Sequence, residues 1–197
     1  MAQGMRRVRV NWRFAGGGLL VLALIAAVLW LWAVGWAPGR DQYPLQGAVI
    51  GAGDGEVNFP TLKAMDSDFI YLRATAGSER RDARFTRNLE AAKAAGLRVG
   101  ALHHFNLCRL ASDQAANFVT TVPRDADLLP PVIELELDEG ECPRRPAAAP
   151  VQSELMTFIN QIEAHAGKPV MLKLTRDFEV EYQVASLISR NLWLTGN

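Results

Sequence analysis

The sequence lacks an excess of charge of either sign. Its 197 residues include 21 lysines and arginines and 21 aspartates and glutamates, so the formal net charge at pH 7 is zero. Binding to nucleic acid as the main activity needs a basic surface, and an acidic disordered tail needs a block of carboxylates. We therefore expect no nucleic-acid partner. Hydrophobic residues make up 49% of the chain, which is enough for a packed core.

Cysteine is also scarce. Cys108 and Cys142 are the two cysteines, and no C-x-x-C or H-x-x-x-H spacing typical of a metal site accompanies them. We therefore expect no metal site. If the domain is exported, both thiols lie in an oxidising compartment and can form a disulfide. The alternative is two separate thiols.

Motifs for phosphate binding or a serine nucleophile are missing as well. Gly51, Gly53 and Gly55 have the spacing G-x-G-x-G, and Glu56 stands where the dinucleotide-binding motif needs a glycine. A carboxylate there repels pyrophosphate, so we interpret the segment as a turn. The sequence contains neither a G-x-S-x-G elbow nor a P-loop.

Charged residues are absent from residues 14–37, and this run has the length of a membrane span. A helix of this length reaches about 36 Å, enough to cross a hydrocarbon core of about 30 Å. Trp30, Trp32 and Trp36 gather at its far end, where indole rings favour the headgroup region. We therefore expect a transmembrane signal-anchor over residues 14–37.

Basic residues before this run predict its orientation, because positive charge stays on the cytoplasmic side. We expect residues 1–13 in the cytoplasm, one pass through the inner membrane, a linker over 38–45 and a periplasmic or other extracytoplasmic domain over 46–197. A signal peptide cleaved after Ala33-Val34-Gly35 is the alternative. The basic residues are Arg6, Arg7, Arg9 and Arg13.

The expected domain alternates strand and helix patterns. Such alternation is typical of βαβ units around a parallel sheet, so the predicted fold class is α/β. A Pro/Ala-rich stretch at 143–150 predicts a loop. The expected strands cover 47–52, 68–75, 97–105, 131–137, 169–174 and 192–195. The expected helices cover 60–65, 82–95, 111–121, 151–166 and 177–189.

Acidic residues alternate along the fourth expected strand. Glu134, Glu136 and Asp138 share one face of it, about 6.5–7 Å apart along the strand. Functional sites of parallel α/β folds gather at the carboxyl ends of strands, and crowded carboxylates suit general acid chemistry. The alternative is an edge strand with a solvated acidic face.

Two histidines end the third expected strand, beside these acids if the strands are neighbours. Adjacent residues face opposite ways, so one of His103 and His104 faces the mouth of the sheet. Arg73, close to the end of the second expected strand, is a candidate contact for a polar ligand.

Several segments, taken in order, resemble the same family. GDGEVNFPTLKA is similar to its turn and first helix, and DFIYLRATAGSERRDARFTRNLEAAKAAGLRVGALHHF to its second strand, helix and third strand. LLPPVIELELD is similar to the strand that carries its Asp-x-Glu motif. The resemblance, from about Leu45 to Trp193, is to glycoside hydrolase family 25, the Chalaropsis-type lysozymes or N-acetylmuramidases. It implies a modified (β/α) barrel without a metal or cofactor, which we expect to be incomplete because the chain ends at Asn197.

The resemblance also implies roles for individual residues. Glu136 falls on the Glu of the Asp-x-Glu motif, the family's proton donor, and Glu134 replaces its Asp. His103 matches a third-strand histidine. The catalytic Asp that normally ends the first strand falls on Val49, and Asp54 is the nearest stand-in.

Other positions depart from the family pattern. Arg73 replaces a Lys, Ala76 replaces a Glu, and Leu102 stands where a Tyr is usual. The catalytic candidates are Glu136 and Glu134, and the candidate substrate-binding residues are His103, Arg73, Asp54 and Asp138.

Two functions follow from these observations. The first is a membrane-anchored hydrolase that cleaves the β-1,4 bond between N-acetylmuramic acid and N-acetylglucosamine in peptidoglycan. The second is a catalytically silent module of the same fold that binds peptidoglycan or acts as a scaffold. Glu136 favours the first function, whereas Val49, Ala76 and the short C-terminus favour the second.

Overall fold

The computed structural model describes residues 12–34, 39–138, 140 and 142–195. The chain divides into two compact units, Met1–Pro44 and Leu45–Asn197. In the first unit, α1 (Trp12–Val34) covers most of the uncharged run. Among the described residues, no helix combines the length and the apolar character that crossing a membrane requires. The features expected at residues 1–11 and 35–38, including Arg6, Arg7, Arg9 and Trp36, lie outside the described ranges.

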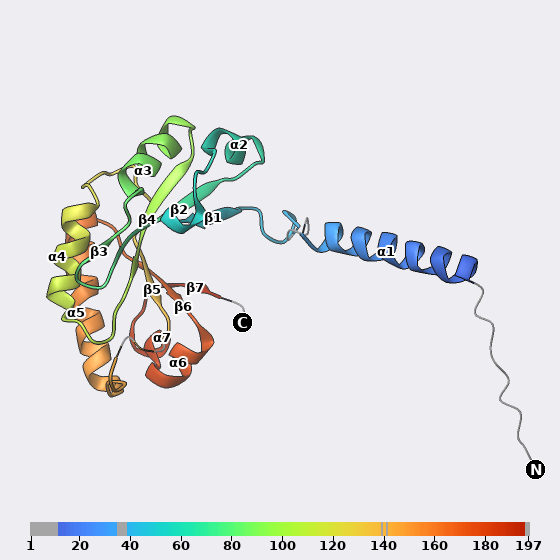
Figure 1. The fold of residues 1–197 in the computed structure, drawn as a ribbon. Helices are drawn as coiled ribbons and strands as arrows, with labels where there is room; N and C mark the ends of the chain where they lie inside the picture. The colour runs from blue at the N-terminus through green and yellow to red at the C-terminus, as the bar shows by residue number, and fades with distance from the viewer. Residues whose placement is uncertain (1–11, 35–38, 139, 141, 196–197) are drawn as a thin grey trace, which may run out of the picture. The chain divides into compact units, whose positions relative to one another are not determined.

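The second unit is built on a curled parallel sheet that forms a half-barrel (Figure 1). Its described parallel strands have the order β1-β2-β4-β5-β6-β7, and the short β3 pairs antiparallel with β2. Because these six neighbours are parallel, their carboxyl ends lie at one edge of the sheet. The strands are β1 (Gly47–Ile50), β2 (Phe69–Ala76), β3 (Arg80–Arg81), β4 (Arg98–His104), β5 (Val132–Leu135), β6 (Met171–Leu174) and β7 (Asn191–Leu194).

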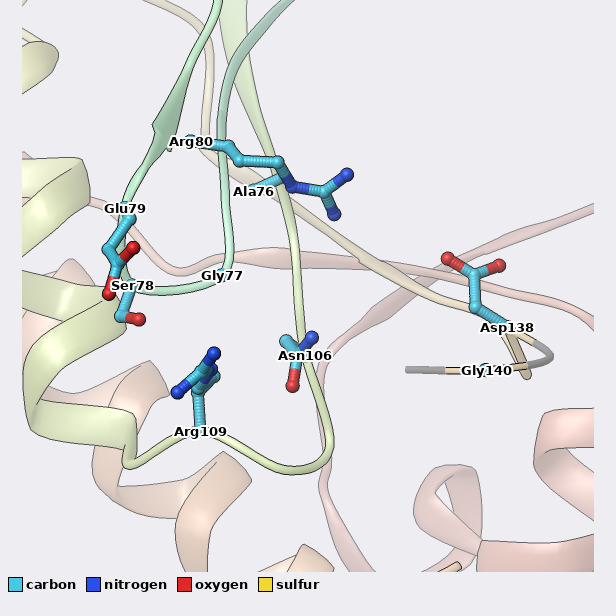
Figure 2. A pocket seen from close by; sticks show the side chains of 9 residues that line it. All are labelled: Ala76, Gly77, Ser78, Glu79, Arg80, Asn106, Arg109, Asp138 and Gly140. Atoms are coloured by element: carbon cyan, nitrogen blue, oxygen red, sulfur yellow. The ribbon is translucent and has the colours of Figure 1, made fainter. Parts of the chain in front are cut away.

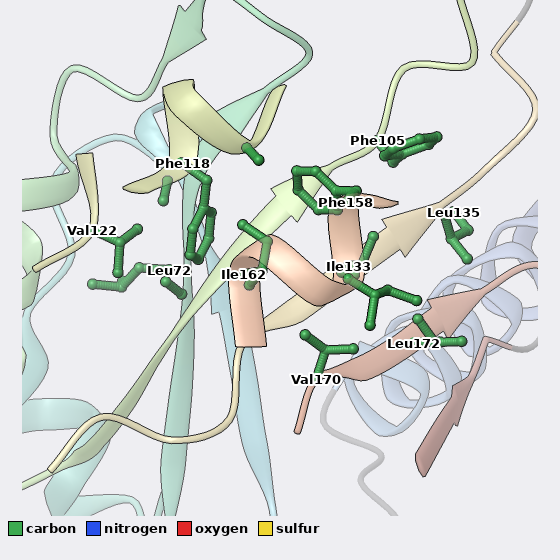
Figure 3. Packing of buried hydrophobic residues seen from close by; sticks show 14 of the residues in the cluster. Leu72, Phe105, Phe118, Val122, Ile133, Leu135, Phe158, Ile162, Val170 and Leu172 are labelled. Carbon is green, nitrogen blue, oxygen red and sulfur yellow. The ribbon is translucent and has the colours of Figure 1, made fainter. Parts of the chain in front are cut away.

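Helices cover the outer face of the curled sheet (Figure 1). Figure 3 shows Phe118, Phe158 and Ile162 of these helices packed toward Leu72 and Ile133 of the strands, and all five are buried. The helices are α2 (Phe59–Ala64), α3 (Phe85–Ala94), α4 (Ala111–Thr121), α5 (Ala148–Ala166), α6 (Arg176–Tyr182) and α7 (Val184–Leu187), with a 3-10 turn at Ala52–Asp54.

Local sequence explains most of these boundaries, and two expectations need correction. The loop expected to extend to Pro150 ends earlier, because α5 begins at Ala148 and its first turn tolerates a proline, which lacks only an unused N–H. The single helix expected over 177–189 is divided into α6 and α7. Gln183 lies between them in a left-handed conformation, with φ of 49°, and interrupts the helix.

The inner face of the sheet carries a second, smaller apolar layer. Tyr71, Leu102 and Val132 are buried there, and Met171 and Trp193 pack against them. Burial raises the pKa of Tyr71 to about 12, and its hydroxyl donates to the Pro130 carbonyl at 3.1 Å.

The strand alternation continues this inner face toward the carboxyl edge of the sheet. On each strand, the residue two positions further along faces the same side. These residues are Arg73 after Tyr71, His104 after Leu102, Glu134 after Val132 and Lys173 after Met171. A layer of charged side chains therefore lies directly above the apolar layer. Since β5 pairs with both β4 and β6, the alternative of a solvated edge strand is wrong.

Candidate active site

Glu134 stands at the centre of the charged layer. Parallel pairing places it opposite His104 of β4 and Lys173 of β6. Its side chain has no exposed surface, and its carboxylate accepts hydrogen bonds from Arg73 at 2.5 and 3.1 Å and from Lys173. His104 Nδ1 lies 3.2 Å from Glu134 Oε2. This carboxylate is enclosed by cationic partners and exposes no surface to solvent.

Burial alone would raise the pKa of Glu134. Its hydrogen bonds to His104, Arg73 and Lys173, together with the positive charge of Arg73, outweigh burial and hold the pKa well below its ordinary value. Glu134 is therefore a buried anion that keeps two cations and a histidine in place.

Glu136 is the accessible carboxylate of this group. It follows the end of β5 on the same face as Glu134, and its side chain is 33% exposed. Its Oε1 lies 3.9 Å from the ammonium of Lys173. Among the described residues, Glu136, Glu134 and His104 each bring a potential ligand atom within 4.8 Å of the others. The position suits a group that touches a ligand at the mouth of the half-barrel.

These three residues do not fit a divalent metal ion. Arg73 and Lys173 already neutralise the Glu134 carboxylate, and a metal ion would have to displace them while repelled by their charge. The donor set agrees with a site that works through side chains alone.

Asp138 and His104 form a further pair at the mouth. His104 Nε2 lies 3.0 Å from Asp138 Oδ2, and the other ring nitrogen faces Glu134. The Asp138 side chain is 44% exposed, whereas that of His104 is 10% exposed. His104 thus connects the buried carboxylate to the loop that follows β5.

His103 faces the other side of β4. It is 1% exposed, its Nδ1 lies 2.7 Å from the Thr75 hydroxyl, and its Nε2 lies 3.2 Å from Gln114 Oε1. Its ring packs on Phe158 with 4.5 Å between centroids, and burial lowers its pKa to about 3. The sequence left open which of the two histidines faces the mouth, and the strand alternation gives that position to His104, so that His103, the candidate substrate-binding residue, lies in the core.

Val49 leaves the end of β1 without the carboxylate expected there, and the nearby carboxylates, Asp54 and Asp82, are engaged by backbone amides. Val49 is half-buried against the inner apolar layer. Asp54 is exposed, and its Oδ2 accepts a hydrogen bond from the Gly51 amide at 2.8 Å, so it closes its own turn. Asp82, which the sequence analysis missed, accepts from the Ala52 amide at 2.6 Å and is likewise used by the backbone.

Lys173 is the second residue that the sequence analysis missed. It contacts Glu134 and lies 5.9 Å from the centroid of the Trp193 ring. The available signal was a lysine within an otherwise apolar expected strand, PVMLKL. A charged residue on a central parallel strand usually has a partner there.

A cavity of about 590 Å³ opens beside this site, at the carboxyl edge of β2, β4 and β5 (Figure 2). The loop after β4 supplies Asn106 and Arg109 to its wall, and the loop after β5 supplies Asp138 and Gly140. A disulfide joins Cys108 of the first loop to a residue of the second, Cys142. The predicted pairing of the two cysteines is present in the structure.

Replacing both cysteines with serine should lower the free energy of unfolding by about 3–4 kcal/mol. The bridge closes a sequence separation of 34 residues, and its loss gives the unfolded chain more conformational freedom. Urea unfolding of exported wild type and variant measures the change, and non-reducing peptide mapping of the wild type should recover the linked pair. Free thiols at both positions would contradict the bridge.

The chain is similar to known proteins in sequence and in fold. The family model for glycosyl hydrolases family 25 matches residues 50–196. The chain belongs to this family. A family 25 glycosyl hydrolase from Bacillus anthracis has a similar structure, with a TM-score of 0.75 and 29% identity over 80% of this chain and 72% of that chain. A search of curated proteins found no match.

Two other family 25 or lysozyme structures share the fold. The bacterial lysozyme from Streptomyces coelicolor has a TM-score of 0.68 at 21% identity, over 76% of this chain and 73% of that chain. The family 25 lysozyme from Aspergillus fumigatus has the same TM-score and identity, over 77% of each chain. The family membership confirms the resemblance that the strand and loop motifs predicted, and the half-barrel is consistent with the family's fold.

Proposed function

We propose that this family 25 domain is a muramidase-type hydrolase that cleaves the β-1,4 bond between N-acetylmuramic acid and N-acetylglucosamine in peptidoglycan. The observation that carries the proposal is the position of Glu136. It is an accessible carboxylate at the carboxyl edge of a central strand, where the Glu of the family's Asp-x-Glu motif is expected. Glycoside hydrolysis needs a proton donor at such a mouth.

In this mechanism Glu136 protonates the glycosidic oxygen as its bond to the anomeric carbon breaks. Most glycosidases use a second carboxylate. Glu134 is not accessible for this role, because Arg73 and Lys173 enclose it. The acetamido oxygen of the substrate therefore attacks the anomeric carbon, as in substrate-assisted glycosidases. Water then opens the cyclic intermediate, and its proton returns to Glu136.

A second function is favoured by two specific observations. Val49 occupies the position of the first-strand Asp, and the Glu134 carboxylate is saturated by its neighbours. A domain with these features can bind glycan strands without cleaving them. Turbidity clearing of purified peptidoglycan by the wild-type protein separates the two functions, because clearing requires bond cleavage and binding alone leaves turbidity unchanged.

The N-terminal segment bears on where in the cell this activity takes place. We propose that residues 14–37 anchor the chain in the inner membrane, with residues 1–13 in the cytoplasm and the family 25 domain outside it. The uncharged run, the preceding arginines and the tryptophans at 30, 32 and 36 support this arrangement.

Reporter fusions after Asn197 should be active when the reporter works outside the cytoplasm and silent when it works inside. The reason is the basic segment, which stays on the cytoplasmic side of the membrane. Replacing Arg6, Arg7 and Arg9 with glutamate should weaken or invert that preference. Activity of a cytoplasmic reporter on the wild-type chain would contradict the topology.

A further inference from the structure

The cavity beside the active site has an unusual lining for a sugar-binding groove. None of the nine described residues that line it is aromatic, so these residues offer no flat apolar surface on which a sugar ring could stack. Polar and charged side chains dominate instead. They are Ser78, Glu79, Arg80, Asn106, Arg109 and Asp138.

Besides Arg80, the described residues that line this cavity include a second arginine, Arg109. Figure 2 shows its side chain rising from the loop after β4 toward Ser78 and Asn106. The residue is exposed, and no ion pair or side-chain hydrogen bond is formed between its guanidinium and any described residue. A guanidinium presents a planar fork of donors that matches a carboxylate.

The lining of the cavity also includes acidic groups. Asp138 is on the opposite wall in Figure 2. Its Oδ2 also lies 3.0 Å from Nε2 of His104. Glu79 lies on the loop after β2. The lining therefore carries both signs of charge, which complements a ligand that also carries both carboxylate and ammonium groups.

We infer that this cavity binds the peptide substituent of the glycan, a short peptide bearing carboxylates and an amino group, with Arg109 as its carboxylate-binding residue. The inference rests on the proposed function, since peptide-substituted N-acetylmuramic acid is the unit that the site would meet. The volume of about 590 Å³ lies within the range of small-ligand pockets, roughly 300–1,000 Å³. The cavity thereby distinguishes peptide-bearing strands from bare strands.

The disulfide supports this role by position. Cys108 is adjacent to Arg109, and Cys142 lies two residues after Gly140 on the facing wall. The bridge keeps the two walls at a fixed separation, which lowers the conformational entropy that binding a peptide would otherwise cost.

Binding of two glycan preparations tests the inference. The full chain, solubilised in detergent and carrying Glu136→Gln to prevent turnover, is mixed with strands that retain their peptides or with strands stripped by an amidase. Peptide-bearing strands should bind at least about tenfold more tightly, as expected for one charge-assisted hydrogen-bonded contact. Arg109→Ala should remove most of that preference, and Arg109→Lys should keep part of it.

Arg124→Ala is the matched control. Arg124 is also exposed, but it lies between α4 and β5, at the opposite edge of the sheet. It should leave the preference unchanged. Equal binding of both preparations, or a preference that survives Arg109→Ala, would overturn the inference even if the wild type cleaves peptidoglycan. A preference that depends on Arg109 in a chain whose wild type cleaves nothing would support the inference and reject the hydrolase. Binding to neither preparation would contradict both.

Discussion

Replacing Glu136 with glutamine should lower the rate of peptidoglycan cleavage by about 10²–10⁴-fold, the usual contribution of a general acid. Glutamine keeps the size and hydrogen-bonding capacity of the side chain but has no proton to transfer to the glycosidic oxygen. Binding to insoluble peptidoglycan should remain, because the surrounding charged layer is unchanged. Release of reducing ends measures cleavage, and co-sedimentation measures binding.

Glu90→Gln is a suitable control, because Glu90 is exposed on α3 away from the mouth. It should cleave like the wild type. Unchanged activity in Glu136→Gln would show that the assigned proton donor is wrong, whatever the fold. If the wild type binds without cleaving and Val49→Asp creates cleavage, the domain is a binding module, and the residue at position 49 is the reason.

Replacing Glu134 with alanine should lower the free energy of unfolding by about 3–5 kcal/mol, the cost of breaking a buried ion pair from one side. Removal of the Glu134 carboxylate leaves Lys173, whose side chain is 12% exposed, without its counter-charge. Arg73 contributes less, because its side chain is 46% exposed and can turn toward water. Urea unfolding measures the change. Lys173→Met added to Glu134→Ala should recover part of it, since the stranded cation is then gone.

The same carboxylate should make stability depend on pH. The pKa of Glu134 is lowered in the folded state, so its contribution is complete above the unfolded value of about 4.3 and is lost progressively as the pH falls below it. The stability difference between wild type and Glu134→Gln should therefore shrink from about pH 5 toward pH 3. Glu56→Gln, which removes an exposed partner of Arg87, should show little effect at any pH. A difference that stays constant with pH would mean that folding does not shift the pKa of Glu134, and a difference that grows as the pH falls would mean that the pKa is raised.

Local patterns were sufficient for much of the fold. The helix expected over 111–121 has those bounds in the structure, because its apolar residues recur at helical spacing and Pro123 follows its end. The helix that packs beside it was expected to end at Ala166, where Gly167 adopts φ of 67° and terminates it. The start of that helix was missed, since a proline in the first helical turn and a proline in a loop look alike in sequence.

The candidate site was less predictable, because its residues meet across strands. The sequence identified Glu134 and Glu136 as one acidic face, and the family resemblance assigned the proton donor to Glu136, but neither showed which carboxylate is accessible. Parallel pairing then surrounds the first with Arg73 and Lys173, while the second lies beyond the end of β5 and stays accessible.

The sequence by itself determined the α/β order of elements, the acidic face of β5 and the family to which the chain belongs. The tertiary structure alone decided that His104 faces the mouth and His103 the core, because the curl of the sheet and the helices packed outside it define which face is inner. It also brought Lys173 to Glu134, since strand register is set by contacts between residues far apart in the chain. The sequence gives the chemistry of each side chain, but the burial of that side chain and its ion-pair partners depend on which strands become neighbours.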